Sequence, residues 1–174
     1  MKSTKYFHVL KHTVYGLLFL IFYILQSVPG FLTVMGVKPV WVLPAAIILA
    51  MFEGEFLGGI YGALAGLLCD IGGFLLFGFN GFLTCLYCVG VGLVIIYLLR
   101  CNLLGGILLT LIFMVLRGSL EFLFEFGMWG YDGVWKIYLA HTLPTALYST
   151  VLAIPLFYLF RGLSRKFNLL LQNS

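Results

Sequence analysis

Apolar residues in this chain form blocks of about twenty positions, separated by short breaks that are polar or hold proline and glycine. A hydrocarbon core of roughly 30 Å takes about twenty helical residues, so such a block is long enough for one membrane crossing. The pattern predicts six helical spans, at about 13–28, 39–52, 55–77, 81–99, 103–126 and 136–160. The second span begins between Pro39 and Pro44, and we expect it to be short or partly re-entrant.

The composition excludes a water-soluble fold. Of the 174 residues, 63% are apolar and 9% are charged, which is more apolar surface than a soluble core could hide. We therefore predict an all-α integral membrane protein, with residues 1–174 forming a single domain, a compact bundle of six transmembrane helices.

Basic residues predict the orientation, because the cytoplasmic loops of membrane proteins retain Lys and Arg. With a cytoplasmic N-terminus, the inner segments hold Lys2, Lys5, Lys11, Arg100, Arg161, Arg165 and Lys166, and the outer loops hold Lys38 and Lys136. This asymmetry predicts that both termini are cytoplasmic. A five-span topology would leave one basic tail outside.

Small residues recur at every fourth position before and along the third span, and the series ends in a carboxylate. The series is Gly54, Gly58, Gly62, Gly66 and Asp70. On a helix these positions form a ridge without side chains, which lets a second helix approach closely inside a membrane. The ridge is therefore predicted to be a packing surface, either within the bundle or for a partner helix.

The fifth span carries three charged residues at four-residue steps. Arg117, Glu121 and Glu125 project to one side of that helix, and Arg117 with Glu121 is well spaced for an ion pair. Charges at membrane depth are costly unless they are paired. We expect the cluster either to orient the bundle or to face a partner or ligand.

A polar stripe follows one face of the last span. It consists of Tyr138, His141, Thr142, Thr145, Tyr148 and Ser149. A polar stripe on a lipid-buried helix turns inward, and we expect hydrogen bonds from His141 or Thr145 to the Arg117–Glu121 pair. A buried, hydrogen-bonded histidine is the simpler interpretation of His141, and a proton relay is the other.

Nothing in the sequence forms a complete catalytic or metal-binding arrangement. Cys85 and Cys88 have C-x-x-C spacing, but they lie inside an apolar span without a second pair or a basic neighbour. We expect no enzymatic activity, no metal and no cofactor. An intramembrane enzyme with Asp70 or Glu121 as its base would need a second catalytic group.

The central part of the chain resembles the family of the rod shape-determining protein MreD. Residues 58–71 read GGIYGALAGLLCDI, residues 77–82 read FGFNGF, and the fourth span ends in LLRCN at 98–102. That family has a glycine-spaced helix that runs into Gly-Leu-x-x-Asp, then a glycine-bearing turn and a helix closed by a basic residue. The resemblance is best over 54–102. Glu53 with Glu55, and Glu121 with Glu125, do not match it.

The resemblance implies a non-enzymatic scaffold subunit of the bacterial cell-elongation machinery, in the cytoplasmic (inner) membrane. Members pair with MreC, a protein that crosses the membrane once, and help to couple MreB filaments to peptidoglycan synthases such as RodA and its transpeptidase partner. They are similar in fold to substrate-binding subunits of energy-coupling-factor transporters. The glycine ridge would then pack against a MreC-like helix or within the bundle, with Asp70 accepting a hydrogen bond at the contact.

The alternative is a vitamin- or small-metabolite-binding subunit of such a transporter. The polar stripe beside Arg117 and Glu121 could line a ligand pocket. However, those subunits carry alanine-spaced small residues on the first helix, where residues 15–23 of this chain are mostly bulky.

Overall fold

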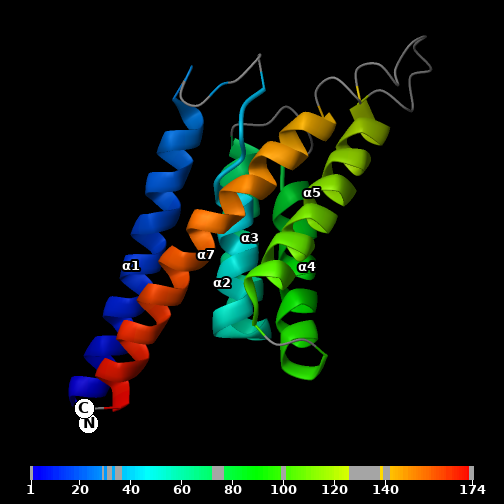
Figure 1. Cartoon of the computed structure of the whole chain (residues 1–174). Coiled ribbons are helices and arrows are strands. Elements are labelled where there is room, and N and C mark those ends of the chain that lie inside the picture. The colour runs from blue at the N-terminus through cyan, green and yellow to red at the C-terminus, as the bar shows by residue number, and fades with distance from the viewer. Residues whose placement is uncertain are drawn as a thin grey trace.

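The computed structural model describes residues 2–28, 30, 33, 37–71, 77–98, 101–125, 138 and 142–172, except for the side chains of 2–6, 8, 125, 168 and 170–172. The helices in these ranges are α1 (Lys2–Ser27), α2 (Val42–Glu53), α3 (Glu55–Ile71), α4 (Phe79–Tyr97), α5 (Leu103–Glu125) and α7 (Leu143–Gln172) (Figure 1). The all-helical class predicted from the sequence is therefore confirmed.

Four of these helices are long and apolar enough to cross a membrane. The apolar stretches are Val9–Ser27 of α1, Phe79–Tyr97, Leu103–Phe124 and Leu143–Phe167 of α7. In contrast, α2 has 12 residues and α3 has 17, so they rise only about 18 and 26 Å. The six-span count thus remains a prediction.

The first and last helices extend further than the apolar pattern indicated. α1 begins at Lys2 instead of near residue 13, and α7 continues to Gln172 instead of ending near 160. Hydropathy marks only the part of a helix that lies in lipid, whereas polar turns can continue beyond it. Pro155 lies inside α7 and does not end it, which is common for proline in membrane helices.

The short helix α2 forms the centre of the bundle. Every residue from Val42 to Met51 is buried, and α2 contacts α1, α3, α4, α5 and α7. A helix that is apolar on all sides is expected to be surrounded by other helices. Pro44 lies in its first turn, where a missing N–H costs no helical hydrogen bond.

A glycine forms the sharp corner between α2 and α3. Gly54 has a φ of 84°, donates its N–H to the Ala50 carbonyl (3.1 Å) and accepts the N–H of Gly58 (2.9 Å). This conformation is strained for any residue with a Cβ atom. Gly54 therefore belongs to the corner and not to the helical ridge in which the sequence placed it.

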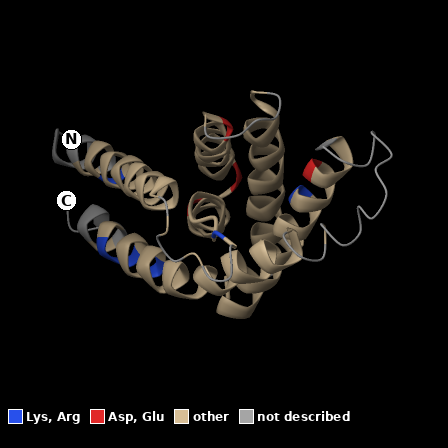
Figure 2. Ribbon diagram, turned by 90° about the horizontal axis from the view of Figure 1, so that it is seen from above, with Lys and Arg blue, Asp and Glu red and all other residues tan. Residues whose placement is uncertain are grey.

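Both ends of the chain lie at the same end of the bundle, where the start of α1 is beside the end of α7 (Figure 1). Viewed from above, the basic residues of α7 follow its last turns toward this end (Figure 2). Tyr15 and Phe19 of α1 pack against Phe160 of α7 and Tyr61 of α3. α1 is thus held by aromatic contacts on one face.

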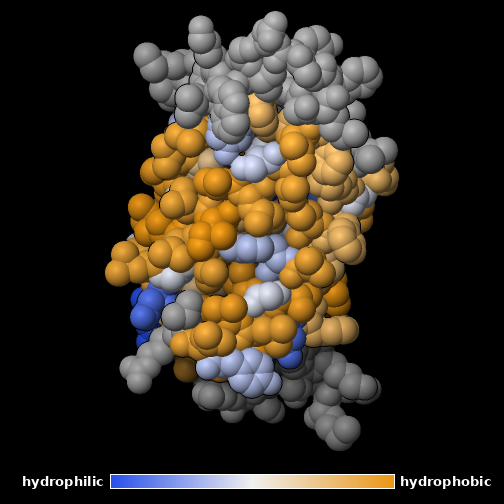
Figure 3. Space-filling model, turned by 90° about the vertical axis from the view of Figure 1, so that its right-hand side faces the viewer, coloured by the Kyte–Doolittle hydropathy of each residue, from blue (hydrophilic) through white to orange (hydrophobic). Residues whose placement is uncertain are grey.

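The outer surface of the bundle is apolar. Large apolar side chains are exposed along α1, α4, α5 and α7, and the coloured part of the surface in Figure 3 is mostly hydrophobic. In a water-soluble protein, so large a continuous apolar patch would be rare. This surface fits contact with lipid.

Candidate functional site

Three glycines of α3 form a face that touches other helices of the same chain. We call Gly58, Gly62 and Gly66 the glycine face. A Cβ atom on Gly58 would lie 2.6 Å from the Ala50 Cβ of α2, and one on Gly62 would lie 2.8 Å from the Thr84 carbonyl oxygen of α4. One on Gly66 would collide with the Asn80 carbonyl. Backbone therefore meets backbone along this face.

The opposing helix carries a matching series at the same four-residue spacing. The residues of α4 that meet the glycine face and the corner before it are Asn80, Thr84, Cys88 and Gly92. The two series run in opposite directions, since Gly66 meets Asn80 whereas Gly92 meets Glu55 at the start of α3. The sequence reasoning missed this second series, although its spacing was readable.

The sequence left open whether the glycine face packs within the bundle or against a partner helix, and the position of α4 bears on this question. α4 and α2 fill the glycine face, and all three of its glycines are buried. A MreC-like partner helix cannot lie on the same surface. The contact of the glycine face in this structure is therefore internal to the bundle, and the place where a MreC-like partner binds stays a prediction.

Asp70, at the end of the same face, holds the start of α4. Its Oδ2 accepts the N–H groups of Gly78 (2.9 Å) and Gly81 (3.2 Å), and its Oδ1 accepts that of Asn80 (3.2 Å). These donors belong to Gly78, the N-cap residue, and to the first turn of α4, where N–H groups have no helical partner and the helix dipole is positive. Asp70 is 6% exposed and thus serves as a buried cap.

We expect Asp70→Asn to destabilise the protein by about 2 kcal/mol, because an amide offers one acceptor atom and turns its NH₂ group toward N–H donors. Thermal unfolding in detergent micelles measures this loss. Glu55→Gln is the control, since Glu55 is half-buried at the other end of α3. An Asp70→Asn protein as stable as the unmodified one would exclude the capping role.

The ion pair predicted on α5 is present and reaches α4. Nη2 of Arg117 donates to Oε1 of Glu121, and Nε of Arg117 donates to Oδ1 of Asn80 (2.7 Å). Because the N–H of Asn80 bonds to Asp70, these residues form a polar chain from α3 through α4 to α5. The sequence reasoning missed Asn80. The signal was that Asn80 is a polar residue next to a glycine turn.

The polar stripe of the last span is divided among several partners. Thr142 and Thr145 lie next to Arg117 and Glu121, as the sequence indicated, but His141 lies outside the described residues. Ser149 accepts the N–H of Val40 (2.9 Å). The predicted bonds from His141 or Thr145 to the ion pair remain a prediction.

The other stripe residues lie further from the ion pair. The hydroxyl of Tyr138 is 2.9 Å from that of Ser119 on α5, and Tyr148 is half-buried. Glu125 is the last residue of α5, and its side chain lies outside the described part.

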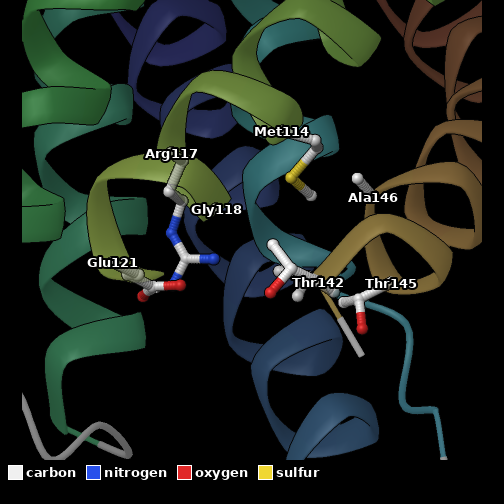
Figure 4. A pocket seen from close by; sticks show the side chains of 8 residues that line it. Met114, Arg117, Gly118, Glu121, Thr142, Thr145 and Ala146 are labelled. Atoms are coloured by element: carbon white, nitrogen blue, oxygen red, sulfur yellow. Dashed lines mark hydrogen bonds and ion pairs between the residues drawn. The ribbon is translucent and has the colours of Figure 1, made fainter. Parts of the chain in front are cut away.

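A pocket of about 170 Å³ opens between α5 and the start of α7. Its described lining consists of Val40, Met114, Arg117, Gly118, Glu121, Thr142, Thr145 and Ala146. Figure 4 shows the guanidinium of Arg117 between Glu121 on one side and Thr142 on the other. The pocket is polar at this end and apolar toward Met114 and Ala146.

A second polar cluster, which the sequence reasoning also missed, joins α1 to the corner between α2 and α3. Nζ of Lys11 lies 2.7 Å from Oε2 of Glu53, and the hydroxyl of Tyr15 donates to Oε1 of Glu53 (2.9 Å). Nδ1 of His12 is 2.8 Å from the hydroxyl of Tyr61. The side chains of Lys11 and Glu53 are only 9% and 5% exposed.

The cysteines take part in packing. Cys88 is buried against Gly62, and Cys85 approaches the position of Gly59. Within the described ranges, all four cysteines are free, and no group of three or more His, Cys, Asp or Glu side chains could hold a metal ion.

Apolar helices long enough to cross a bilayer, with polar groups bonded between helices, define a helical membrane protein. A family model, described as rod shape-determining protein MreD, matches residues 8–167. The chain belongs to the MreD family. The match confirms the resemblance found in residues 54–102 and extends it over most of the chain. Comparisons with curated proteins and with solved structures gave no match.

Proposed function

We propose that this chain is a non-enzymatic scaffold subunit of the cell-elongation machinery in the bacterial cytoplasmic membrane. It links a MreC-like partner and MreB filaments to peptidoglycan synthesis, and so maintains cell shape. The observation that carries the proposal is the family match over residues 8–167, because that family acts in rod shape determination.

The use of the polar groups supports a scaffold rather than an enzyme. Asp70 accepts three backbone N–H groups, and Glu53 accepts bonds from Lys11 and Tyr15. A carboxylate whose oxygens accept such bonds is held in place by its neighbours. These groups fix one helix against another.

The charge distribution supports cytoplasmic termini. Arg161, Arg165 and Lys166 are exposed on the part of α7 that runs toward the end of the bundle where both chain ends lie. Positive residues at one end of a helical bundle favour the cytoplasmic side. Because the glycine face is filled, a partner helix binds elsewhere on the bundle.

The test is affinity purification of the tagged chain from native membranes in mild detergent. We expect a MreC-like protein with a single membrane span to co-purify, and cells without this chain to lose their rod shape. A folded chain that brings down an ATPase-containing transport module instead would contradict the proposal.

The alternative of a vitamin-binding transporter subunit gains no support from the pocket beside Arg117. Its volume of about 170 Å³ is well below the range of roughly 300–1,000 Å³ that is typical of small-molecule sites. No vitamin-binding function is proposed.

A further inference from the structure

The pocket between α5 and α7 combines both charge signs with a hydroxyl group. Arg117 uses Nε and Nη2 for its bonds to Asn80 and Glu121, and its third nitrogen points across the pocket toward Thr142 (Figure 4). A guanidinium can donate five hydrogen bonds, and a carboxylate can accept several. The pocket can therefore hold an anionic group at Arg117 and a cationic donor at Glu121.

The depth of the pocket places these charges close to a membrane surface. Counting from Leu103 at about 1.5 Å per residue, Arg117 lies roughly 21 Å and Glu121 roughly 27 Å along α5. The hydrocarbon core is about 30 Å thick, so Glu121 reaches the level at which lipid headgroups begin. Met114 and Ala146, which line the apolar end of the pocket, each lie about one helical turn further along α5 or α7 from that level than Arg117 and Thr142 do.

The size of the pocket also suits a headgroup. A volume of about 170 Å³ is below the roughly 300–1,000 Å³ of pockets that enclose a whole small molecule. The space is enough for a phosphate with a short aminoalkyl group. It is too small for a sugar-bearing headgroup.

We propose that this pocket binds the headgroup of a zwitterionic phospholipid with a primary amine. The phosphate lies at the free edge of the Arg117 guanidinium and the Thr142 hydroxyl, and the ammonium donates to Glu121. A purely anionic headgroup brings no positive charge to Glu121 and is repelled by it. A quaternary ammonium cannot donate a hydrogen bond.

The test uses native mass spectrometry of the full chain, released from nanodiscs with equal parts of phosphatidylethanolamine, phosphatidylglycerol and phosphatidylcholine. We expect phosphatidylethanolamine to be retained about fivefold over each of the others, the effect of one partly exposed ion pair. Bound lipids in the proportions of the bilayer would overturn the proposal. Binding of free phosphoethanolamine at millimolar concentration, together with bound lipids in the proportions of the bilayer, would assign the site to a soluble zwitterion instead.

Two variants and a control separate this site from general stability. Glu121→Gln should reverse the preference toward phosphatidylglycerol, because Arg117 is left without a counter-charge. Glu55→Gln removes a carboxylate at the opposite end of the bundle and should change nothing. Thr142→Val keeps the shape of the side chain and should lower retention of phosphatidylethanolamine about threefold, the effect of one hydrogen bond. An unchanged lipid profile in a folded Glu121→Gln or Thr142→Val protein contradicts the proposal.

Discussion

Glu53→Leu is expected to lower the free energy of unfolding by about 3–5 kcal/mol and to release α1 from the bundle. The substitution leaves the Lys11 ammonium without its carboxylate at a position where that side chain is 9% exposed. It also removes the acceptor of the Tyr15 hydroxyl. Removing one partner of a buried pair costs more than the pair itself contributes, because the other charge stays buried.

Two measurements check this expectation. The midpoint of thermal unfolding in detergent reports stability, and hydrogen–deuterium exchange of the α1 backbone reports whether α1 stays packed against α3 and α7. Lys11→Met with Glu53→Leu is the rescue variant, since an apolar pair of similar volume is often neutral or stabilising. If the double variant is no more stable than Glu53→Leu alone, the buried charge is not the cause.

Gly66→Leu is expected to separate α3 from α4, at a cost of about 3 kcal/mol or more. A Cβ atom at Gly66 would collide with the Asn80 carbonyl and would lie 2.6 Å from the Gly81 Cα atom. Both are backbone atoms of the α4 first turn, so no side-chain rotation can relieve the overlap. The same shift would pull the α4 N–H groups away from Asp70.

Gly90→Leu is the matched control. Gly90 lies on α4, and a Cβ atom there would meet nothing within 4 Å. Leucine also favours a helix over glycine by roughly 0.5–1 kcal/mol. Thermal unfolding should therefore distinguish a strongly destabilised Gly66→Leu from a neutral or slightly stabilised Gly90→Leu, and equal effects would contradict tight packing along the glycine face.

The sequence predicted the helical class and the family well, because both depend on local patterns. The apolar blocks gave α2, α4 and α5 to within a few residues. The spacing of Gly58, Gly62 and Gly66 correctly marked a packing face. Such patterns repeat within one helix and can be read without knowing its neighbours.

The pairing between helices could not be read in the same way. Arg117 bonds to Asn80 and Lys11 pairs with Glu53, and both contacts join positions far apart in the chain. Periodicity identifies the face that a helix turns inward, but it does not identify the helix that meets it. For the same reason, the glycine spacing left open whether α4 or a partner would fill the face.

The enclosed position of α2 also sets an order of events during biosynthesis. Four of the five helices that surround it, α3, α4, α5 and α7, leave the ribosome after it does. A helix of about 18 Å is too short to rest stably across the bilayer on its own. It is therefore fully enclosed only after α7, the last of these helices, has been synthesised, and a nascent chain that stops before α7 leaves part of the apolar surface of α2 uncovered.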